Sequence, residues 1–346
     1  MPIRVPNDVW TVSLQGFSDG NWSWQVTAKD QGSKGGNTAT SEWVAFSVGS
    51  GGGGGGTTGD TITNSEWLSG GTVQTAAGRL YFEMPKNSKW KGPWQGYVCS
   101  GTVVTDMYND RSIILTAAHC VYDDVNKAFA RNVLFIPNQA DTTGSGTDLN
   151  CDNDPMGCWV PSFGVVDTEW TARVFPDNIQ WDYAHYVVDN LDAHTGVGAW
   201  GALDSAAGSL AIQFDPVPII NDGTDGSASL DFTHALGYSY NEDPKLMFCA
   251  EDMTTEGAVN WWLPSCGLSG GSSGGPWVQP MNESTGIGPV ISLNSWGYLG
   301  APGMAGPKLN DGDSTASCLF ATAEGTGLGG SYDDGYAGVV QGPCGP

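Results

Sequence analysis

Residues 266–277 read CGLSGGSSGGPW, and this stretch governs how the rest of the chain is interpreted. Small residues on both sides of Ser273 let a substrate approach its hydroxyl, and they permit a turn whose N–H groups converge on one point. The stretch is weak evidence by itself, because runs of Gly and Ser are usually loops. A serine hydroxyl also needs a base beside it before it becomes a useful nucleophile.

The candidate base is one of 4 histidines, and all of them precede Ser273 in the chain. This order excludes the Ser, Asp, His succession of α/β-hydrolases, although Gly271 and Gly275 around Ser273 formally match their nucleophile elbow. His119 is the strongest candidate, because it follows the run IILTAA at 113–118 and is flanked by small residues and Cys120. The remaining three are less suited: a buried structural role is expected for His185, and loop-like surroundings for His194 and His234.

Asp182 lies among large apolar residues in the segment WDYAHYVV at 181–188. A carboxylate in such a segment should be buried, and a buried carboxylate needs a partner. Orienting an imidazole through its Nδ1–H would satisfy it. The alternative, a turn cap before a strand, would be preferred for Asp182 alone but not beside His119 and Ser273.

Four segments in this order resemble the motifs of chymotrypsin-like serine proteases. TAAHC at 116–120 resembles the histidine motif, DYA at 182–184 the aspartate motif, GSSGGP at 271–276 the nucleophile motif, and NSWG at 294–297 the substrate-binding strand. The resemblance spans roughly residues 80–300 and is closest to secreted bacterial trypsin-like enzymes, whose nucleophile segment matches Cys266 to Trp277.

The resemblance implies a role for each matched position. Ser273 would attack the scissile carbonyl, His119 would carry the proton, and Asp182 would orient the imidazole. The backbone N–H groups of Gly271 and Ser273 would form the oxyanion hole, where one donor is typically worth about 3 kcal/mol. The implied substrate-binding positions are Asn294, Ser295, Trp296, Gly297 and Gly267.

Three positions differ from related enzymes and bear on activation and specificity. Ser272 stands where the animal enzymes have an Asp that pairs with a new N-terminal amine, so we expect no such ion pair here, and we expect the oxyanion geometry to survive trimming before residue 80. Gly267 stands where trypsin has its pocket carboxylate, and Asn294 where glutamyl-specific relatives have a His. We therefore expect a preference for uncharged residues before the scissile bond, because an unpaired charge would lose its hydration.

Composition limits the partners and the compartment. With 37 acidic and 13 basic residues, a net charge of −24 makes nucleic acid and anionic membranes improbable partners.

The 8 cysteines form no CxxC pair, which favours disulfides in an oxidising compartment. The resemblance implies Cys99–Cys120; pairing of nearest neighbours then gives Cys151–Cys158, Cys249–Cys266 and Cys318–Cys344.

The pattern along residues 60–346 predicts an all-β domain, because short β-like runs are separated by turn residues and no long helical period occurs. The resemblance implies two six-stranded antiparallel β-barrels with the active site between them. The expected strands cover residues 79–83, 97–104, 113–116, 133–136, 183–188, 210–214 and 289–293.

The first 48 residues predict a different unit. Alternating runs at 10–14, 22–28 and 44–48 resemble the last strands of an immunoglobulin-like or fibronectin-like module, which gives a short β-sandwich fragment. The sequence GSGGGGGGTTG at 49–59 predicts a flexible linker. No signal peptide is recognisable, so we expect a piece of a longer secreted precursor.

The sequence therefore predicts a secreted serine endopeptidase that acts on proteins or peptides as a monomer, without cofactor or metal. Asn/Asp/Gly clusters at 221–226 and 310–314 fit solvated turns better than Ca²⁺ loops, since neither completes an EF-hand. Two alternatives stay open: a catalytically idle binding protein, which would not react with a fluorophosphonate, and an esterase, which comparison of ester and peptide turnover would reveal.

Overall fold

The computed structural model describes residues 20–24, 27–29, 38–40 and 44–48, then 61–325 except 90, 109, 147, 191–192, 198–200, 215–231 and 312–314, and finally 338–341. The chain divides into two compact units, Met1–Gly55 and Gly56–Pro346, and each is described by itself.

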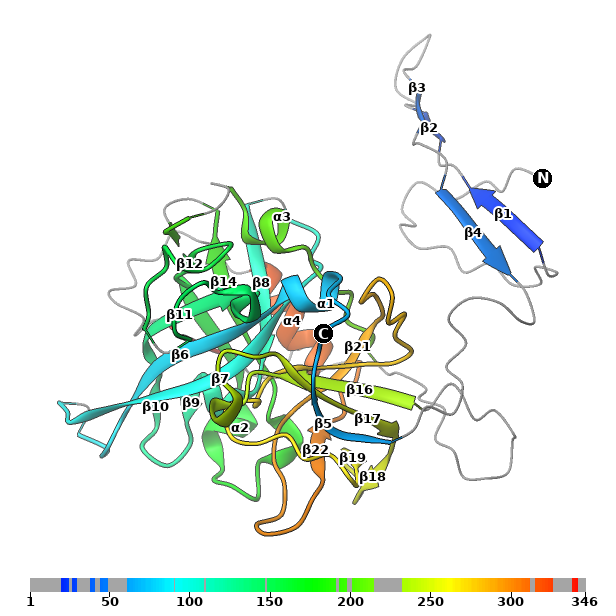
Figure 1. Ribbon diagram of the computed structural model, residues 1–346. Coiled ribbons are helices and arrows are strands. Elements are labelled where there is room, and N and C mark those ends of the chain that lie inside the picture. The colour runs from blue at the N-terminus through cyan, green and yellow to red at the C-terminus, as the bar shows by residue number, and fades with distance from the viewer. Residues whose placement is uncertain are drawn as a thin grey trace. The chain divides into compact units, whose positions relative to one another are not determined.

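The first unit contains two antiparallel strand pairs (Figure 1). Strand β1 (Gly20–Trp24) pairs with β4 (Val44–Val48), and β2 (Thr27–Lys29) pairs with β3 (Thr38–Thr40). The runs expected at 22–28 and 44–48 thus contain strands, whereas the run at 10–14 lies outside the described residues.

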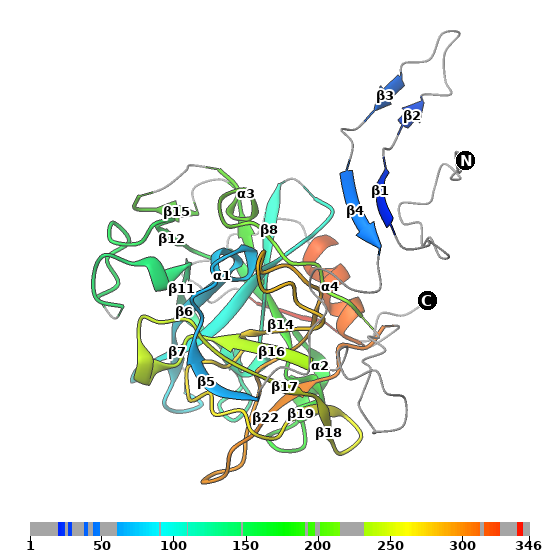
Figure 2. The same cartoon turned by 45° about the vertical axis from the view of Figure 1, so that its right-hand side comes forward.

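The larger unit is built mainly of curled β-sheets, as the sequence predicts (Figures 1 and 2). One sheet has 9 strands in the order β15-β12-β11-β6-β7-β8-β14-β13-β23. In chain order its members are β6 (Ala77–Pro85), β7 (Trp94–Val104), β8 (Arg111–Thr116), β11 (Arg131–Pro137), β12 (Cys158–Trp159), β13 (Phe163–Asp167), β14 (Ala184–Asp189), β15 (His194–Thr195) and β23 (Gly338–Gln341). All its pairs are antiparallel except β13 with β23, which is parallel.

The second half of the domain forms a 5-stranded sheet, β21-β20-β16-β17-β5, and a 3-stranded sheet, β18-β19-β22. Their strands are β5 (Ile62–Glu66), β16 (Phe232–Gly237), β17 (Met247–Asp252), β18 (Thr254–Glu256), β19 (Asn260–Leu263), β20 (Pro276–Val278), β21 (Val290–Leu293) and β22 (Met304–Pro307). A further hairpin joins β9 (Tyr122–Asp123) to β10 (Ala128–Phe129).

Six of the seven expected runs contain a regular strand, and the seventh does not. Residues 210–214 make only single bridges, Val104 with Leu210 and Ile212 with Val290. This segment therefore touches strands of two different sheets, and a regular ladder with either one would prevent contact with the other.

Helices are short, with one exception. The five-residue helices are α1 (Thr72–Ala76), α2 (Thr168–Ala172) and α3 (Leu203–Ala207), and the 3₁₀ turns are η1 (Ala118–Cys120), η2 (Gln139–Asp141), η3 (Ile179–Trp181) and η4 (Tyr240–Glu242). Helix α4 (Ala316–Gly325) has 10 residues and was not expected from the sequence. It packs on β14, where the Phe320 and His185 rings lie 5.3 Å apart (Figure 2).

The domain has two buried hydrophobic clusters. The larger lies mainly in the 9-stranded sheet and contains Phe135, Trp159 and Trp170, and the smaller lies in the second half around Trp277, Ile291 and Leu263. Strand order explains the position of the candidate site: His119 follows β8, Asp182 precedes β14, and β8 pairs with β14. Ser273 precedes β20 in the second half.

Candidate active site

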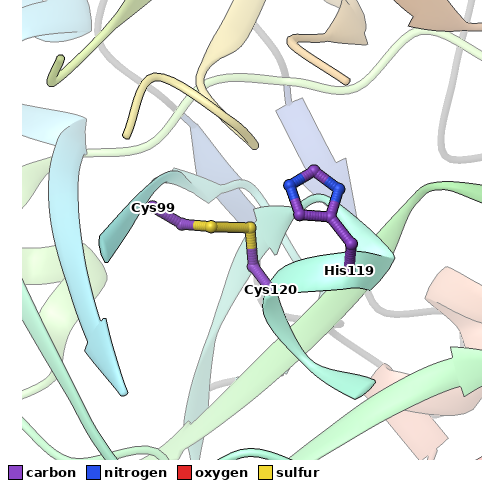
Figure 3. A group of neighbouring side chains, drawn as sticks. All are labelled: Cys99, His119 and Cys120. Carbon is purple, nitrogen blue, oxygen red and sulfur yellow. A yellow bond between two sulfur atoms is a disulfide. The ribbon is translucent and has the colours of Figure 1, made fainter. Parts of the chain in front are cut away.

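His119 is positioned by a buried strand and a disulfide. Every residue of β8 is buried, and Ala117 continues the extended backbone before the η1 turn that carries His119. Cys120 in that turn is bonded to Cys99 of β7, with their Cα atoms 6.2 Å apart. Figure 3 shows the imidazole beside this disulfide, on the same turn as Cys120. The turn that holds the candidate base is therefore attached covalently to the sheet.

Asp182 is buried and points at His119. Its Oδ2 atom lies 2.8 Å and its Oδ1 atom 3.1 Å from His119 Nδ1, and Oδ1 also accepts a 2.9 Å hydrogen bond from the His119 backbone N–H. The antiparallel pairing of Ala184 with Thr116 brings the start of β14 beside the end of β8 and so produces this contact. The carboxylate fixes both the ring and the backbone of the residue it orients.

Ser295 supplies a further hydrogen bond to Asp182 that the sequence did not suggest. Its hydroxyl donates to Asp182 Oδ2 at 2.5 Å. The segment at 294–297 suggested backbone contacts to substrate for Ser295, and nothing in the pattern distinguished its side chain. Asp182 thus receives donors from His119 and from the second half of the domain.

The electrostatics of the pair favour an ionised Asp182 beside an imidazole that protonates readily. Burial alone would lower the pKa of His119, but the charge of Asp182 and its hydrogen bond to the ring outweigh it, so the pKa is raised above 6.5. Burial alone would raise the pKa of Asp182, but the contacts with His119 and Ser295 lower it below its usual value. This is the arrangement in which a carboxylate stabilises an imidazolium.

Ser273 lies against the turn of His119. Its carbonyl accepts a 2.7 Å hydrogen bond from the Ser100 N–H and lies 3.9 Å from Cys120 Sγ. Gly274 has φ +83°, and a Cβ there would come within 2.2 Å of Thr116 Oγ1. Within the described residues no hydrogen bond joins the Ser273 hydroxyl to His119, and in free enzymes such bonds are often long and tighten only with substrate.

The two candidate oxyanion donors are unoccupied. Among the described residues, neither the Gly271 N–H nor the Ser273 N–H has a hydrogen-bond acceptor. Gly271 has φ +96°, and a Cβ there would lie 2.8 Å from the Tyr238 carbonyl. Both donors are therefore available to a negatively charged oxygen, as an oxyanion hole requires.

The segment from Ser295 to Gly297 has one edge occupied and one edge available. The Ser295 N–H donates to the Ala305 carbonyl at 2.9 Å, and the Trp296 carbonyl accepts from the Ala305 N–H at 2.7 Å. Within the described part of the chain, the Ser295 carbonyl and both polar backbone groups of Gly297 make no hydrogen bond. An extended peptide could pair with this edge.

Aromatic rings surround Trp296. Its ring centroid lies 5.2 Å from Tyr298, 6.2 Å from Trp262 and 6.5 Å from Phe175. Phe175 and Tyr298 are more than half exposed. The available backbone edge is thus bordered by an apolar surface.

Two residues expected near the substrate have other contacts in the structure. The Asn294 side chain is fully buried and donates to the carbonyls of Leu236 and Ser272. Gly267 is exposed, and its N–H donates to the Thr63 carbonyl of β5 at 2.6 Å. The contact with β5 also bears on trimming before residue 80, because such trimming would remove the strand that holds Gly267.

The other histidines are buried. His185 is 1% exposed, as expected for a structural residue. His194 and His234 were expected in loop-like surroundings, but they lie in β15 and β16 and are buried as well.

Three expected disulfides are confirmed: Cys99–Cys120, Cys151–Cys158 and Cys249–Cys266. The fourth expected pair involves Cys344, outside the described residues.

A ring nitrogen of His119 and the sulfurs of Cys99 and Cys120 lie within 4.8 Å of one another. A cysteine binds a metal through its thiolate, and Cys99 and Cys120 are joined in a disulfide, so this cluster is unsuitable as a metal site. The cluster at 221–226 and part of that at 310–314 also lie outside the described residues.

This chain is similar to known proteins in structure. No family profile and no curated protein matches the sequence. The chain is similar to a thermostable serine protease, AL20, from an extremophilic microorganism, with TM-score 0.54 and 23% identity over 74% of this chain and 100% of that chain. It is also similar to a Glu endopeptidase solved in complex with MPD, with TM-score 0.51 and 13% identity over 78% of this chain and 100% of that chain.

This chain has the fold of serine proteases. The similarity agrees with the chymotrypsin-like fold implied by the four motifs, and it covers the whole of both solved proteins. Among the described residues, no helix is both long and apolar enough to cross a membrane.

Proposed function

We propose that this protein is a secreted serine endopeptidase in which Ser273, His119 and Asp182 are the catalytic residues. The observation that carries the proposal is the hydrogen-bonded series from Ser295 through Asp182 to His119, beside a Ser273 loop with two unoccupied N–H donors. The shared fold with serine proteases supports it.

The first step of the reaction forms a tetrahedral intermediate. A peptide pairs with the available edge at Ser295 and Gly297, and Ser273 Oγ attacks the scissile carbonyl carbon. His119 Nε2 accepts the hydroxyl proton, while Asp182 stabilises the resulting imidazolium through Nδ1. The carbonyl oxygen becomes negative and accepts hydrogen bonds from the N–H groups of Gly271 and Ser273.

The later steps form the acyl-enzyme and then hydrolyse it. The imidazolium of His119 gives its proton to the leaving amine, the C–N bond breaks, and Ser273 carries the acyl group. His119 then removes a proton from water, which attacks the ester and regenerates the Ser273 hydroxyl. The residues described here can hold or move the proton at each step, so the scheme needs no cofactor.

The central test uses a fluorophosphonate, which phosphonylates an activated serine. We expect labelling of the natural protein and none of Ser273→Ala, with Ser272→Ala as the matched control that keeps its label. The Ser272 hydroxyl donates to the Ser269 carbonyl instead of facing the substrate. Absence of labelling in the natural protein would favour an idle binding protein, and turnover of esters without peptides would favour an esterase.

Substrate preference forms the finer part of the proposal. We propose cleavage after uncharged residues, because the Asn294 amide is committed to buried hydrogen bonds and Gly267 carries no charge. Peptides that differ only before the scissile bond, with Phe, Leu, Arg, Lys and Glu there, test this preference. Fastest cleavage after Glu would instead match the activity named for one structural neighbour.

The disulfides also fit the secreted part of the proposal. Three bonds of this kind would not persist in a reducing cytosol. The protein is proposed to act as a monomer on protein or peptide substrates.

A further inference from the structure

The carbonyl groups of the Ser273 loop are held by specific partners. The Gly270 carbonyl accepts from the Tyr240 N–H at 2.9 Å, the Gly271 carbonyl from the Ser100 hydroxyl at 2.9 Å, and the Ser272 carbonyl from Asn294 Nδ2 at 3.0 Å. Three consecutive peptide groups are therefore held through hydrogen bonds to their carbonyl oxygens.

Two of these carbonyls, those of Gly270 and Ser272, set the direction of the oxyanion donors directly. The Gly271 carbonyl, which Ser100 holds, shares its peptide plane with the Ser272 N–H and fixes the peptide group between the two donors. A peptide group is planar and trans, so its N–H points opposite to its C=O. The Ser273 N–H shares a peptide plane with the Ser272 carbonyl, and the Gly271 N–H shares one with the Gly270 carbonyl. The Ser272 carbonyl accepts both from Asn294 Nδ2 and from the Gly275 N–H, each at 3.0 Å, so Asn294 supplies the side-chain half of the contact that sets the direction of the Ser273 N–H.

Asn294 is itself held rigidly. It is fully buried, its Oδ1 accepts from Trp277 Nε1 at 2.8 Å, and its second Nδ2 hydrogen bonds the Leu236 carbonyl at 2.7 Å. The indole N–H can only donate, so it fixes which end of the amide faces the Ser272 carbonyl. The amide cannot turn without breaking three hydrogen bonds.

Ser100 connects the loop to the first half of the domain. Its hydroxyl donates to the Gly271 carbonyl and accepts from the Tyr238 N–H at 2.8 Å, and its own N–H donates to the Ser273 carbonyl at 2.7 Å. Its side chain is 1% exposed, so water does not compete for these bonds. Ser100 lies next to Cys99, whose disulfide holds the turn of His119.

We infer that Ser100 and Asn294 are positioning residues that pre-organise the oxyanion hole. They form an internal clamp in a chain where Ser272 offers no charge to a terminal amine, and the clamp lies entirely within folded residues of the domain. The inference rests on the proposed function, because it assigns a role to residues behind the Gly271 and Ser273 donors. Neither residue touches the substrate.

The test compares Ser100→Ala and Asn294→Asp with a control on the same strand, Thr102→Val. Thr102 is also buried in β7, and its hydroxyl has no hydrogen-bond partner among the described residues. Asn294→Asp keeps the size of the side chain but replaces the donating NH₂ by oxygen. Kinetics use the best peptide of the specificity panel, with folding checked by thermal unfolding.

We expect kcat to fall about ten- to hundredfold in both clamp variants, with KM within about twofold, because the donors act on the transition state. The pKa of the oxyanion in the tetrahedral adduct with a peptidyl trifluoromethyl ketone, followed by ¹⁹F NMR, should rise. Thr102→Val should change neither quantity. A merely structural role would lower the melting temperature without moving the pKa of the adduct.

Unchanged kcat and adduct pKa in a folded clamp variant would overturn the inference, as would an equal loss in Thr102→Val or a change confined to KM. If one clamp variant does not fold, the other decides. Failure of the proposed function is separate: the natural protein would then not react with the fluorophosphonate at Ser273.

Discussion

At the scale of single residues, the pKa of His119 governs activity against pH. The base must be neutral to accept the Ser273 proton, so activity should fall as pH drops through the pKa of His119. Burial alone would lower this pKa, but Asp182 raises it above 6.5, so we expect the acidic limb of kcat/KM above that pH.

Replacing the carboxylate reverses the shift. Asp182→Asn should move the acidic limb to lower pH and reduce kcat by roughly 10⁴-fold, the loss seen when the orienting Asp of a well-studied triad enzyme is made Asn. A pH–rate profile for both proteins measures both effects. An acidic limb that stays in place would show that Asp182 does not control His119.

The Ser295 hydroxyl predicts a smaller effect. Removing a hydrogen bond to a charged group costs about 1.5–3 kcal/mol, so Ser295→Ala should lower kcat by roughly tenfold or more. Ser292→Ala is the matched control, since that buried hydroxyl donates to the Pro307 carbonyl and does not contact Asp182. Equal losses in the two variants would indicate damage to β21 instead of a role at Asp182.

At the scale of elements, His185 makes the contact between β14 and α4 sensitive to acid. Its ring lies 5.3 Å from Phe320, and burial lowers its pKa from 6.5 to about 3. Because the folded pKa is below the unfolded one, the unfolded state binds more protons between these values. Stability should therefore decrease as pH falls through this window, by at most about 1.4 kcal/mol per pH unit from this group.

His185→Leu should remove this component. Urea unfolding of both proteins between pH 7 and pH 4 measures the difference in slope of the unfolding free energy. Parallel curves would mean that the acid sensitivity arises from other groups. Activity at pH 8 should be similar in both, because His185 lies outside the candidate site.

Strand β5 is anchored by Trp67. This side chain is 4% exposed, packs edge-on against Phe248 at 5.2 Å, and its backbone N–H donates to the Leu246 carbonyl. Trp67→Ala should cost about 3–5 kcal/mol of unfolding free energy, the usual range for a buried Trp. Leu68→Ala is the control, because Leu68 is 82% exposed and should change stability by less than about 0.5 kcal/mol.

Loss of β5 should also affect the loop that contains Gly267. The Thr63 carbonyl holds the Gly267 N–H at 2.6 Å, so a displaced strand would loosen this loop and raise KM. Deleting residues 61–67 should therefore impair substrate binding. Unchanged KM in a folded deletion variant would show that β5 is dispensable for substrate binding.

At the scale of the whole molecule, the candidate site is contained in one unit. His119, Asp182, Ser273 and the clamp residues all belong to Gly56–Pro346, and the Gly-rich sequence at 49–59 predicts a flexible connection. Replacing residues 51–56 by a recognition sequence for a specific protease allows the chain to be cut after folding. We expect kcat/KM to remain within about twofold of the uncut variant.

A large loss on cutting would show that the first unit takes part in catalysis or in substrate binding. The same variant before cutting is the control for the inserted sequence. The resemblance of residues 1–48 to an immunoglobulin-like or fibronectin-like module stays a prediction, and the measurement does not depend on it.

The sequence by itself predicted the all-β class and the candidate residues His119, Asp182 and Ser273 in that order. Short motifs carry these candidates because the chemistry constrains neighbouring positions: a nucleophile needs small residues around it, and a buried carboxylate needs a partner. The resemblance implied the Cys99–Cys120 pair, and pairing of nearest neighbours gave the other two disulfides that the structure contains. Short runs of apolar and β-branched residues between turn residues likewise predicted six strands of the larger unit, including β8, which is buried along its whole length.

Only the tertiary structure decided which distant residues hydrogen-bond to these motifs. Ser100 and Asn294 are 194 positions apart in the sequence, and only folding brings both to the loop of Ser273. The same holds for Ser295 on Asp182, for Thr63 on Gly267 and for the parallel edge at β23. Hydrogen bonds between distant segments depend on which strands become neighbours, and no local pattern of residue types records that choice.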